Sequence, residues 1–140
     1  MDETLFEIRD YGGKGYQPLI DFGEWRVAFL RYLDDIQPDL INSMERHTET
    51  DEVFVLLNGR GALIMGGNGT EVDSIISQRM ESGKVYNIKR LAWHTILLSR
   101  DATVLLVENR DTSKHNSEYV SLSQTQRGQI MEIARHESFE

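Results

Sequence analysis

The chain has 140 residues, which suits a single domain spanning 1–140. Its 23 acidic and 15 basic residues give a formal net charge of −8, and such a surface repels phosphate backbones, so no nucleic-acid partner is expected. The absence of cysteine excludes disulfides and thiolate metal ligands and suits a reducing compartment, so we expect a cytoplasmic protein. The acidic N-terminus MDETLFEIRD has no apolar core and no apolar run approaches the roughly 20 residues of a membrane span, so neither a signal peptide nor a membrane partner is expected.

Short runs of alternating apolar and polar residues dominate the chain, and turn signals separate them. Asn58-Gly59 is a strong hairpin signal, Gly66 to Gly69 ends the strand after it, and Arg100-Asp101 marks a later tight turn. In chain order we expect strands over residues 25–33, 52–57, 61–65, 72–76, 84–88, 94–98 and 103–107.

Only the tail has the pattern of a helix. Ser121 or Ser123 is the expected N-cap of a segment within residues 121–136 whose apolar stripe includes Ile130 and Ile133. Many short strands at regular spacing with glycine-rich turns indicate an all-β sandwich or barrel.

Two segments carry candidate functional side chains, residues 45–59 and 83–94. Glu45 and His47 lie two apart and share a strand face. Glu52 begins the next strand, and His94 begins a third. If these faces line one barrel, two imidazoles and two carboxylates converge into a set suited to Zn, Mn, Fe or Ni. The alternative is a hydrogen-bonded histidine and a solvated glutamate, and Glu45 is the weakest of the four.

The two segments resemble the two motifs of the cupin superfamily. The first motif has two histidines, a glutamate and a glycine, and this chain matches it at His47, Glu52 and Gly59 but has Glu45 at the first histidine. The second motif is matched at Gly83 and His94. It is not matched at residues 89 and 91, where Lys and Leu stand at the positions of a proline and a glycine.

This resemblance implies a double-stranded β-helix, the cupin-type jelly-roll barrel, with its core over about residues 25–110 and a short C-terminal helix over about 121–136. It also implies a divalent metal held by Glu45, His47, Glu52 and His94, no organic cofactor, and a catalytic role for the last three. A homodimer is implied as well, in which a strand over residues 4–8 covers a sheet edge.

A second, local resemblance is to the ureidoglycolate lyase family, which also has cupin-type barrels. It rests on Met-Glu-Arg-His at 44–47 and on Trp93-His94. It implies a lyase that releases urea from a small polar carboxylate, although Glu52 stands where that family commonly has an amide side chain.

Two further residues are candidates for substrate binding. Arg31 alternates with Trp25 and Phe29 on the face that we assign to the interior, where it would pair with Glu52 or Glu108 or hold a ligand carboxylate. Tyr86 would donate from the barrel wall or simply pack. His115 and His136 receive no role, and Glu49 and Asp51 are expected at the surface.

Three functions are compatible with this pattern. The first is an enzyme that acts on a small, polar, anionic molecule by lyase, isomerase or oxygenase chemistry. The second is a non-catalytic barrel that binds or senses a small ligand with a degenerate metal site. The third is a structural dimer, and it is disfavoured because such a barrel has no need of three polar side chains facing inwards.

Overall fold

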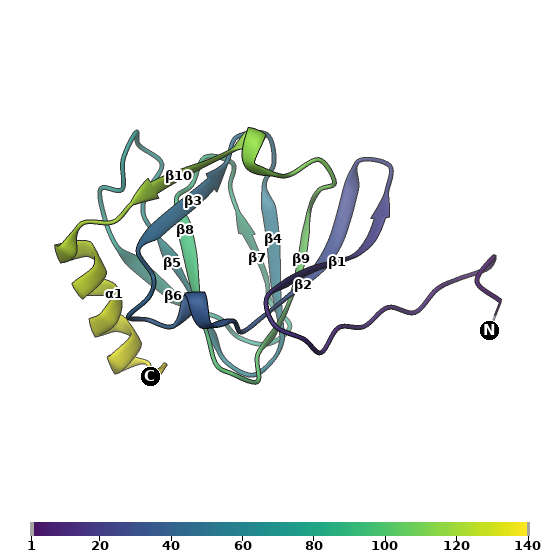
Figure 1. Cartoon of the computed structure of the whole chain (residues 1–140), viewed down its shortest axis with the longest axis horizontal. Helices are drawn as coiled ribbons and strands as arrows, with labels where there is room; N and C mark the ends of the chain where they lie inside the picture. The colour runs from purple at the N-terminus through teal and green to yellow at the C-terminus, as the bar shows by residue number, and fades with distance from the viewer. Residues whose placement is uncertain (1, 140) are drawn as a thin grey trace.

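The computed structural model describes residues 2–139 and shows two five-stranded antiparallel sheets that face each other (Figure 1). The first sheet has the order β1 (Tyr16–Phe22), β2 (Trp25–Arg31), β9 (Thr103–Asn109), β4 (Glu52–Asn58) and β7 (Val85–Ile88). The second has the order β10 (Ser117–Ser121), β3 (Ser43–His47), β8 (His94–Leu98), β5 (Gly61–Met65) and β6 (Ile76–Arg79). The all-β expectation is confirmed.

The turns after β4 and β8 carry the chain from one sheet to the other. Gly59 has a φ of +77°, and a Cβ there would lie 2.6 Å from Cα of Ala102. The turn expected at Asn58-Gly59 is therefore present, but the expected hairpin is wrong, because β4 pairs with β7 and β9 while β5 pairs with β6 and β8. The turn at Arg100-Asp101 links β8 to β9 in the same way.

The space between the sheets holds an apolar core. Inward positions alternate along each strand, as in Phe54 and Leu56 on β4 and Ile96 and Leu98 on β8, all less than 7% exposed. The same alternation continues into polar side chains at one end of the barrel, and this is where the candidate site lies.

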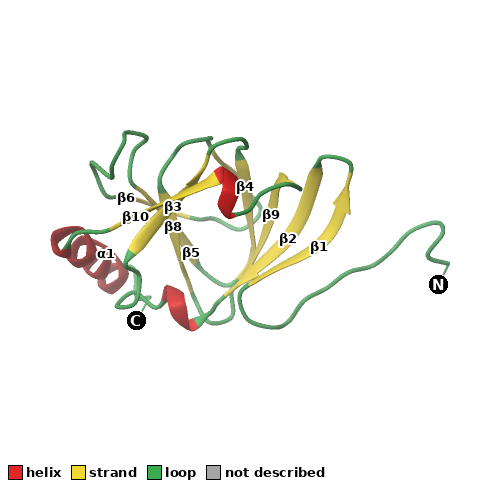
Figure 2. Ribbon diagram, turned by 45° about the horizontal axis from the view of Figure 1, so that its top comes forward, coloured by secondary structure: helices red, strands yellow, loops and turns green. Residues whose placement is uncertain are grey.

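A second apolar cluster lies outside the barrel, between the second sheet and helix α1 (Gln124–His136). Ile130 and Ala134 of the helix pack with outward residues of the sheet such as Ile64 and Leu97. The Ser123 side chain accepts a hydrogen bond from the Gln126 backbone N–H, so Ser123 and not Ser121 is the N-cap. Figure 2 shows α1 beside β10, far from β1 and β2.

Several elements differ from expectation. Strands β1 and β10 were not expected, and each adds an edge strand from outside residues 25–110. The strand expected over 72–76 is wrong, because Val72 instead packs in the cluster under α1 and pairing with β5 begins only at Ile76. Residues 4–8 form a turn and extended chain, not a strand. Two short 3₁₀ segments complete the fold, η1 (Asp34–Ile36) and η2 (Lys114–Asn116).

Strand β2 faces the opposite way from the alternation that we assumed. Ala28 is fully buried and packs in the core with Leu30, whereas Trp25 is 45% exposed. Both faces of β2 are rich in apolar residues, so alternation by itself does not decide between them. Across residues 2–139, none of the helices is long and apolar enough to cross a membrane.

Candidate functional site

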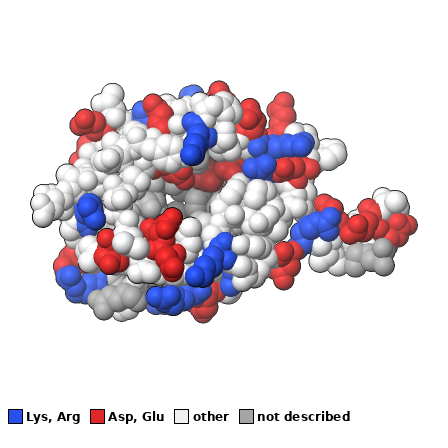
Figure 3. Space-filling model, viewed as in Figure 1, with Lys and Arg blue, Asp and Glu red and all other residues white. Residues whose placement is uncertain are grey.

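A cavity of about 890 Å³ opens between the sheets at the end of the barrel that holds the polar side chains. Figure 3 shows the hollow, with acidic atoms around it. Its wall contains four acidic side chains and one lysine among the lining residues, namely Asp35, Glu45, Glu52, Glu108 and Lys114. Carboxyl groups therefore outnumber lysine in the wall, and the two histidines His47 and His94 also line it.

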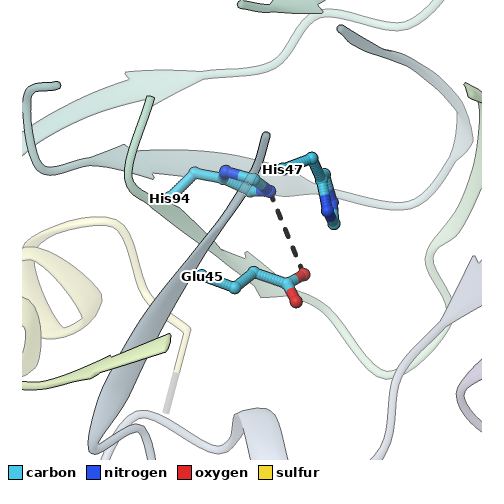
Figure 4. Close-up of side chains that lie close together, drawn as sticks. All are labelled: Glu45, His47 and His94. Carbon is cyan, nitrogen blue, oxygen red and sulfur yellow. Dashed lines mark ion pairs between the residues drawn. The ribbon is translucent and has the colours of Figure 1, made fainter. Parts of the chain in front are cut away.

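His47 and His94 come from neighbouring strands and point toward each other, with ring centroids 5.6 Å apart. Glu52 lies between them from the opposite sheet, with its Oε1 atom 3.2 Å from Nε2 of His47 and 3.3 Å from Nε2 of His94. Glu45 faces the same space, and its Oε1 is 4.0 Å from Nε2 of His94 (Figure 4). The structure thus brings together all four residues that the motif spacing singled out.

The other ring nitrogen of each histidine is already engaged. Nδ1 of His94 donates to the carbonyl of Ala92 at 2.9 Å, and Nδ1 of His47 lies 2.8 Å from the hydroxyl of Ser117. Because a carbonyl only accepts, the neutral form of His94 carries its proton on Nδ1 and has a bare Nε2. That Nε2 is buried and has no hydrogen-bond partner within the described part of the chain.

Mutual attraction shifts the pKa values of these groups. Burial alone would raise the pKa of Glu52, but the hydrogen bond with His47 and the charge interactions with both histidines lower it far below its ordinary value. Burial opposes the charged form of His47 and of His94, yet the contact with Glu52 raises the pKa of both imidazoles. The cluster is therefore organised around an anionic Glu52 that favours positive charge beside it.

Glu108 on β9 and Tyr16 on β1 belong to the same site and were missed as functional residues. The Tyr16 hydroxyl donates to Oε1 of Glu108 at 2.6 Å. Burial, followed by the nearby charge of Glu52, raises the pKa of Glu108 to about 7. A signal for Glu108 existed in the sequence, because it alternates with Val104 and Leu106, whereas Tyr16 lies on a strand that alternation did not reveal.

The donors present suit a divalent cation. Ligand atoms of Glu45, His47 and His94 lie within 4.8 Å of one another, and so do those of His47, Glu52 and Glu108. The buried Nε2 of His94 faces a carboxylate oxygen of Glu52. In neutral His94 both of these atoms are hydrogen-bond acceptors, so a proton or a cation between them is needed for a favourable contact. A histidine that donates its second N–H to a backbone carbonyl is also the usual arrangement of a metal ligand.

Arg31 and Tyr86 do not reach the cavity. Arg31 shares the outward face of β2 and donates to the carbonyl of Gly13 and to the Thr103 hydroxyl, so the expected pairing with Glu52 or Glu108 is wrong. Tyr86 packs against the core, and its hydroxyl accepts from the backbone N–H of Glu81. The structure thus places both outside the residues that line the cavity.

The remaining polar residues of the motif region have local roles. Asp51 accepts from the backbone N–H of Arg90 and from the Asn87 amide, and it ties the loop after β3 to the loop after β7. Glu49 accepts from the Asn116 amide, and His115 lies near Asp111 at the surface.

No family model matches the sequence, and no significant match was found among curated proteins. Solved structures do match in fold. The Streptomyces protein Pac13, described as a nucleoside dehydratase and crystallised with uridine, is 7% identical with a TM-score of 0.54, and the match covers 82% of this chain and 86% of that one. WlaRA from Campylobacter jejuni, a TDP-fucose-3,4-ketoisomerase, is 16% identical with a TM-score of 0.52, over 69% and 68% of the two chains.

KdgF from a Halomonas species is 10% identical with a TM-score of 0.51, over 71% of this chain and 81% of that one. At these identities the likeness concerns the fold alone. Together with the two facing five-stranded sheets and the C-terminal helix, it shows that this chain is a protein of the cupin fold.

Proposed function

We propose that the chain is a metal-dependent enzyme that moves a proton on a small polar molecule bound inside the barrel, in a lyase, dehydratase or isomerase reaction. The observation that carries this proposal is the buried Nε2 of His94, which has no hydrogen-bond partner among residues 2–139 and faces the carboxylates of Glu52 and Glu45. A cation between these groups would give the neutral imidazole a partner, whereas a buried polar atom left without one costs stability.

Glu45, His47, Glu52 and His94 would hold the ion, and their mixed nitrogen and oxygen donors suit Zn, Mn, Fe or Ni. A bound divalent ion supplies Lewis acidity toward a carbonyl or hydroxyl oxygen. Glu108 would accept or return the substrate proton. The Glu108 carboxyl lines the cavity, the Tyr16 hydroxyl fixes its orientation, and burial together with Glu52 raises its pKa to about 7 in the metal-free protein.

The charge of the cavity limits the substrate. The lining holds four acidic side chains beside Lys114 and the two histidines, so a multiply charged anion meets carboxylates there, and a bound ion would favour a single carboxylate. We therefore propose a substrate with a carbonyl or hydroxyl group and at most one carboxylate, such as the small polar carboxylate implied by the resemblance to ureidoglycolate lyases. Two fold neighbours are named for dehydratase and ketoisomerase activities, which supports a proton-transfer reaction class.

The experiment has two steps. Protein purified without chelators is analysed for bound metals, and the expected result is one divalent ion per chain. The protein is then incubated in D₂O with panels of small hydroxy acids, ureido acids, keto sugars and nucleosides, and NMR follows deuterium entry at carbon. Exchange that disappears with EDTA and returns with the ion supports the proposal, whereas absence of both metal and exchange contradicts it.

The second candidate function is a non-catalytic barrel that binds a small ligand. It is favoured by Glu45, whose side chain is 40% exposed and which stands where the cupin motif has a histidine. In the same experiment this function predicts metal and ligand binding with no deuterium exchange.

A further inference from the structure

A second pocket lies beyond the C-terminal end of β8, away from His94 at the start of that strand. Its volume is about 490 Å³, and within residues 2–139 it shares no lining residue with the first cavity. Its wall includes the segment after η1, the turns that follow β4 and β8, and the end of helix α1. Both ribbon views show η1 beside the end of α1 (Figures 1 and 2). The pocket is therefore separate from the candidate metal site.

Arginine dominates the charge of this second pocket. Among residues 2–139, its charged lining residues are Arg60, Arg100, Arg135 and a single acid, Asp39. The chain as a whole has 23 acidic and 15 basic residues and a formal net charge of −8. A pocket that concentrates positive charge on such a chain attracts anions selectively.

The C-terminal segment holds Arg60 in place without neutralising it. Nη1 of Arg60 donates to the carbonyl of Glu137 at 2.9 Å, and Nη2 donates to the carbonyl of Ser138 at 3.0 Å. Cζ of Arg60 also lies 4.9 Å from the ring centre of Phe139. The carboxylate of Glu137 contacts Arg79 instead, at 3.2 Å. Because carbonyls and aromatic rings carry no net charge, the positive charge of Arg60 stays available to a ligand.

Arg100 is likewise without a carboxylate partner. Its Cζ lies 4.8 Å from the ring centre of Tyr32, which also lines the pocket. Across residues 2–139, neither Arg60 nor Arg100 forms an ion pair, whereas Arg135 pairs with Glu132 on its own helix. Two arginines without an anion and a third paired at the helix surface thus line one pocket.

The pocket has room for more than an inorganic ion. Its volume lies in the range of about 300–1,000 Å³ that is usual for small-molecule sites. Part of the lining is apolar and comprises Pro38, Leu98, Met131, Ala134 and Phe139. A ligand that uses both parts of the wall combines an anionic group with an organic group.

We propose that this pocket, here called the arginine pocket, is a second ligand site that binds a small phosphate monoester. Three arginines against one aspartate give the lining a formal charge of +2, and a phosphate monoester carries close to two negative charges at neutral pH. The planar guanidinium group donates two parallel hydrogen bonds to phosphate oxygens, which a point charge cannot do. The organic group of the ester lies against the apolar part of the wall.

NMR titration of chelator-treated protein tests the site, because removal of metal prevents an ion in the first cavity from holding phosphate. The ligands are inorganic phosphate, glycerol 3-phosphate, adenosine monophosphate and, as a dianion without phosphorus, succinate. We expect saturable shifts of the Ser99 and Arg100 amides, with the two monoesters bound more tightly than inorganic phosphate and than succinate. High salt weakens the binding, since the arginines are exposed.

Variants test which charges act. Arg100→Gln removes a cation from an exposed turn and is expected to weaken binding of the monoesters about fivefold or more. Arg127→Gln is the matched control, because Arg127 is an exposed arginine of α1 outside the lining, and it leaves the affinity unchanged. Asp39→Asn removes the acid of the lining and is expected to tighten binding about twofold. This gain in affinity cannot result from a damaged fold.

Four results overturn the proposal. The first is the absence of saturable binding of every phosphate compound by the wild-type chain. The second is a set of shifts confined to residues of the first cavity. The third is succinate bound as tightly as the monoesters, which makes the pocket a general anion site. The last is an affinity that Arg100→Gln and Arg127→Gln lower equally, or that Asp39→Asn fails to raise.

Discussion

Nε2 of His94 lies 3.3 Å from Oε1 of Glu52, and both side chains are almost completely buried. The proton of neutral His94 is committed to the carbonyl of Ala92, so the two facing atoms are both acceptors. Either the imidazole takes a second proton or a cation lies between the two residues. The first alternative governs the metal-free protein and the second the metal-bound one, and each leads to a prediction.

Replacement of either histidine is expected to abolish metal binding. His47→Ala and His94→Ala each remove a nitrogen donor from the centre of the cluster, whereas Glu45→Ala removes a half-exposed oxygen donor and weakens binding less. Isothermal titration of the chelator-treated protein measures the affinities. His115→Ala is the control, because His115 lies at the surface near Asp111. Tight binding by His94→Ala would place the ion elsewhere.

The metal-free protein is expected to lose stability as the pH rises above the ordinary histidine pKa of about 6.5. The pKa values of His47 and His94 are raised by Glu52, so their stabilising contribution is complete below the ordinary pKa and is lost as the pH rises through the folded-state pKa. Glu52 has the opposite pH dependence. Because its pKa is lowered in the folded state, its contribution to folding stability is present above its ordinary pKa and is lost as the pH falls through the folded-state pKa. Urea unfolding across this pH range, in the presence of EDTA, measures the curve.

Glu108 contributes to the same pH dependence. Its pKa is raised to about 7 by burial and by Glu52, so the folded state holds a proton that the unfolded state releases, and this contribution is lost as the pH rises through about 7. Glu108→Gln keeps an acceptor for the Tyr16 hydroxyl and removes the titration, so the variant is expected to be more stable than the parent above pH 7 by about 2 kcal/mol. Glu71→Gln, at an exposed acid, is the control. Equal stability of the Glu108 variant and the parent at pH 8 would show that Glu108 does not titrate in this range.

The positive φ of Leu91 predicts that glycine is more stable than alanine at this position. Leu91 has a φ of +71° while its N–H donates to the carbonyl of His47, and a left-handed conformation costs a non-glycine residue about 1–2 kcal/mol. Leu91→Gly and Leu91→Ala both lose the side chain, but only alanine keeps the strained Cβ. We therefore expect the glycine variant to be more stable by about 1 kcal/mol in thermal unfolding. An alanine variant of equal or greater stability would contradict this account.

The start of α1 offers a prediction about the cap. Ser123 and Gln126 form reciprocal hydrogen bonds, and Ser123→Ala removes one of them at a cost of about 1 kcal/mol. Ser121→Ala, at an exposed position of β10, is expected to change stability little. Comparing the unfolding free energies of the two variants separates the residues that the sequence left as alternative caps.

Local patterns in the sequence determined much of the fold and of the site. Alternation located β4, β5, β8 and β9 to within two residues, because a strand has a period of two whatever it pairs with. The spacing of Glu45 and His47 placed both on one face for the same reason, and the motif spacing added Glu52 and His94. Each of these inferences depends on neighbours in the sequence.

Only the tertiary structure decided what depends on distant partners. The Asn58-Gly59 turn is the same whether it joins paired strands or two different sheets, and long-range pairing made it the latter. The orientation of β2 could not be read from alternation, because its outward residues Val27 and Phe29 are as apolar as its inward ones. Because of that ambiguity, alternation along the strand assigned Arg31 to the interior of the barrel. In the structure, the pairing of β2 with β1 and β9 directs Arg31 outward, and Tyr16 of β1 contacts Glu108 at the cavity.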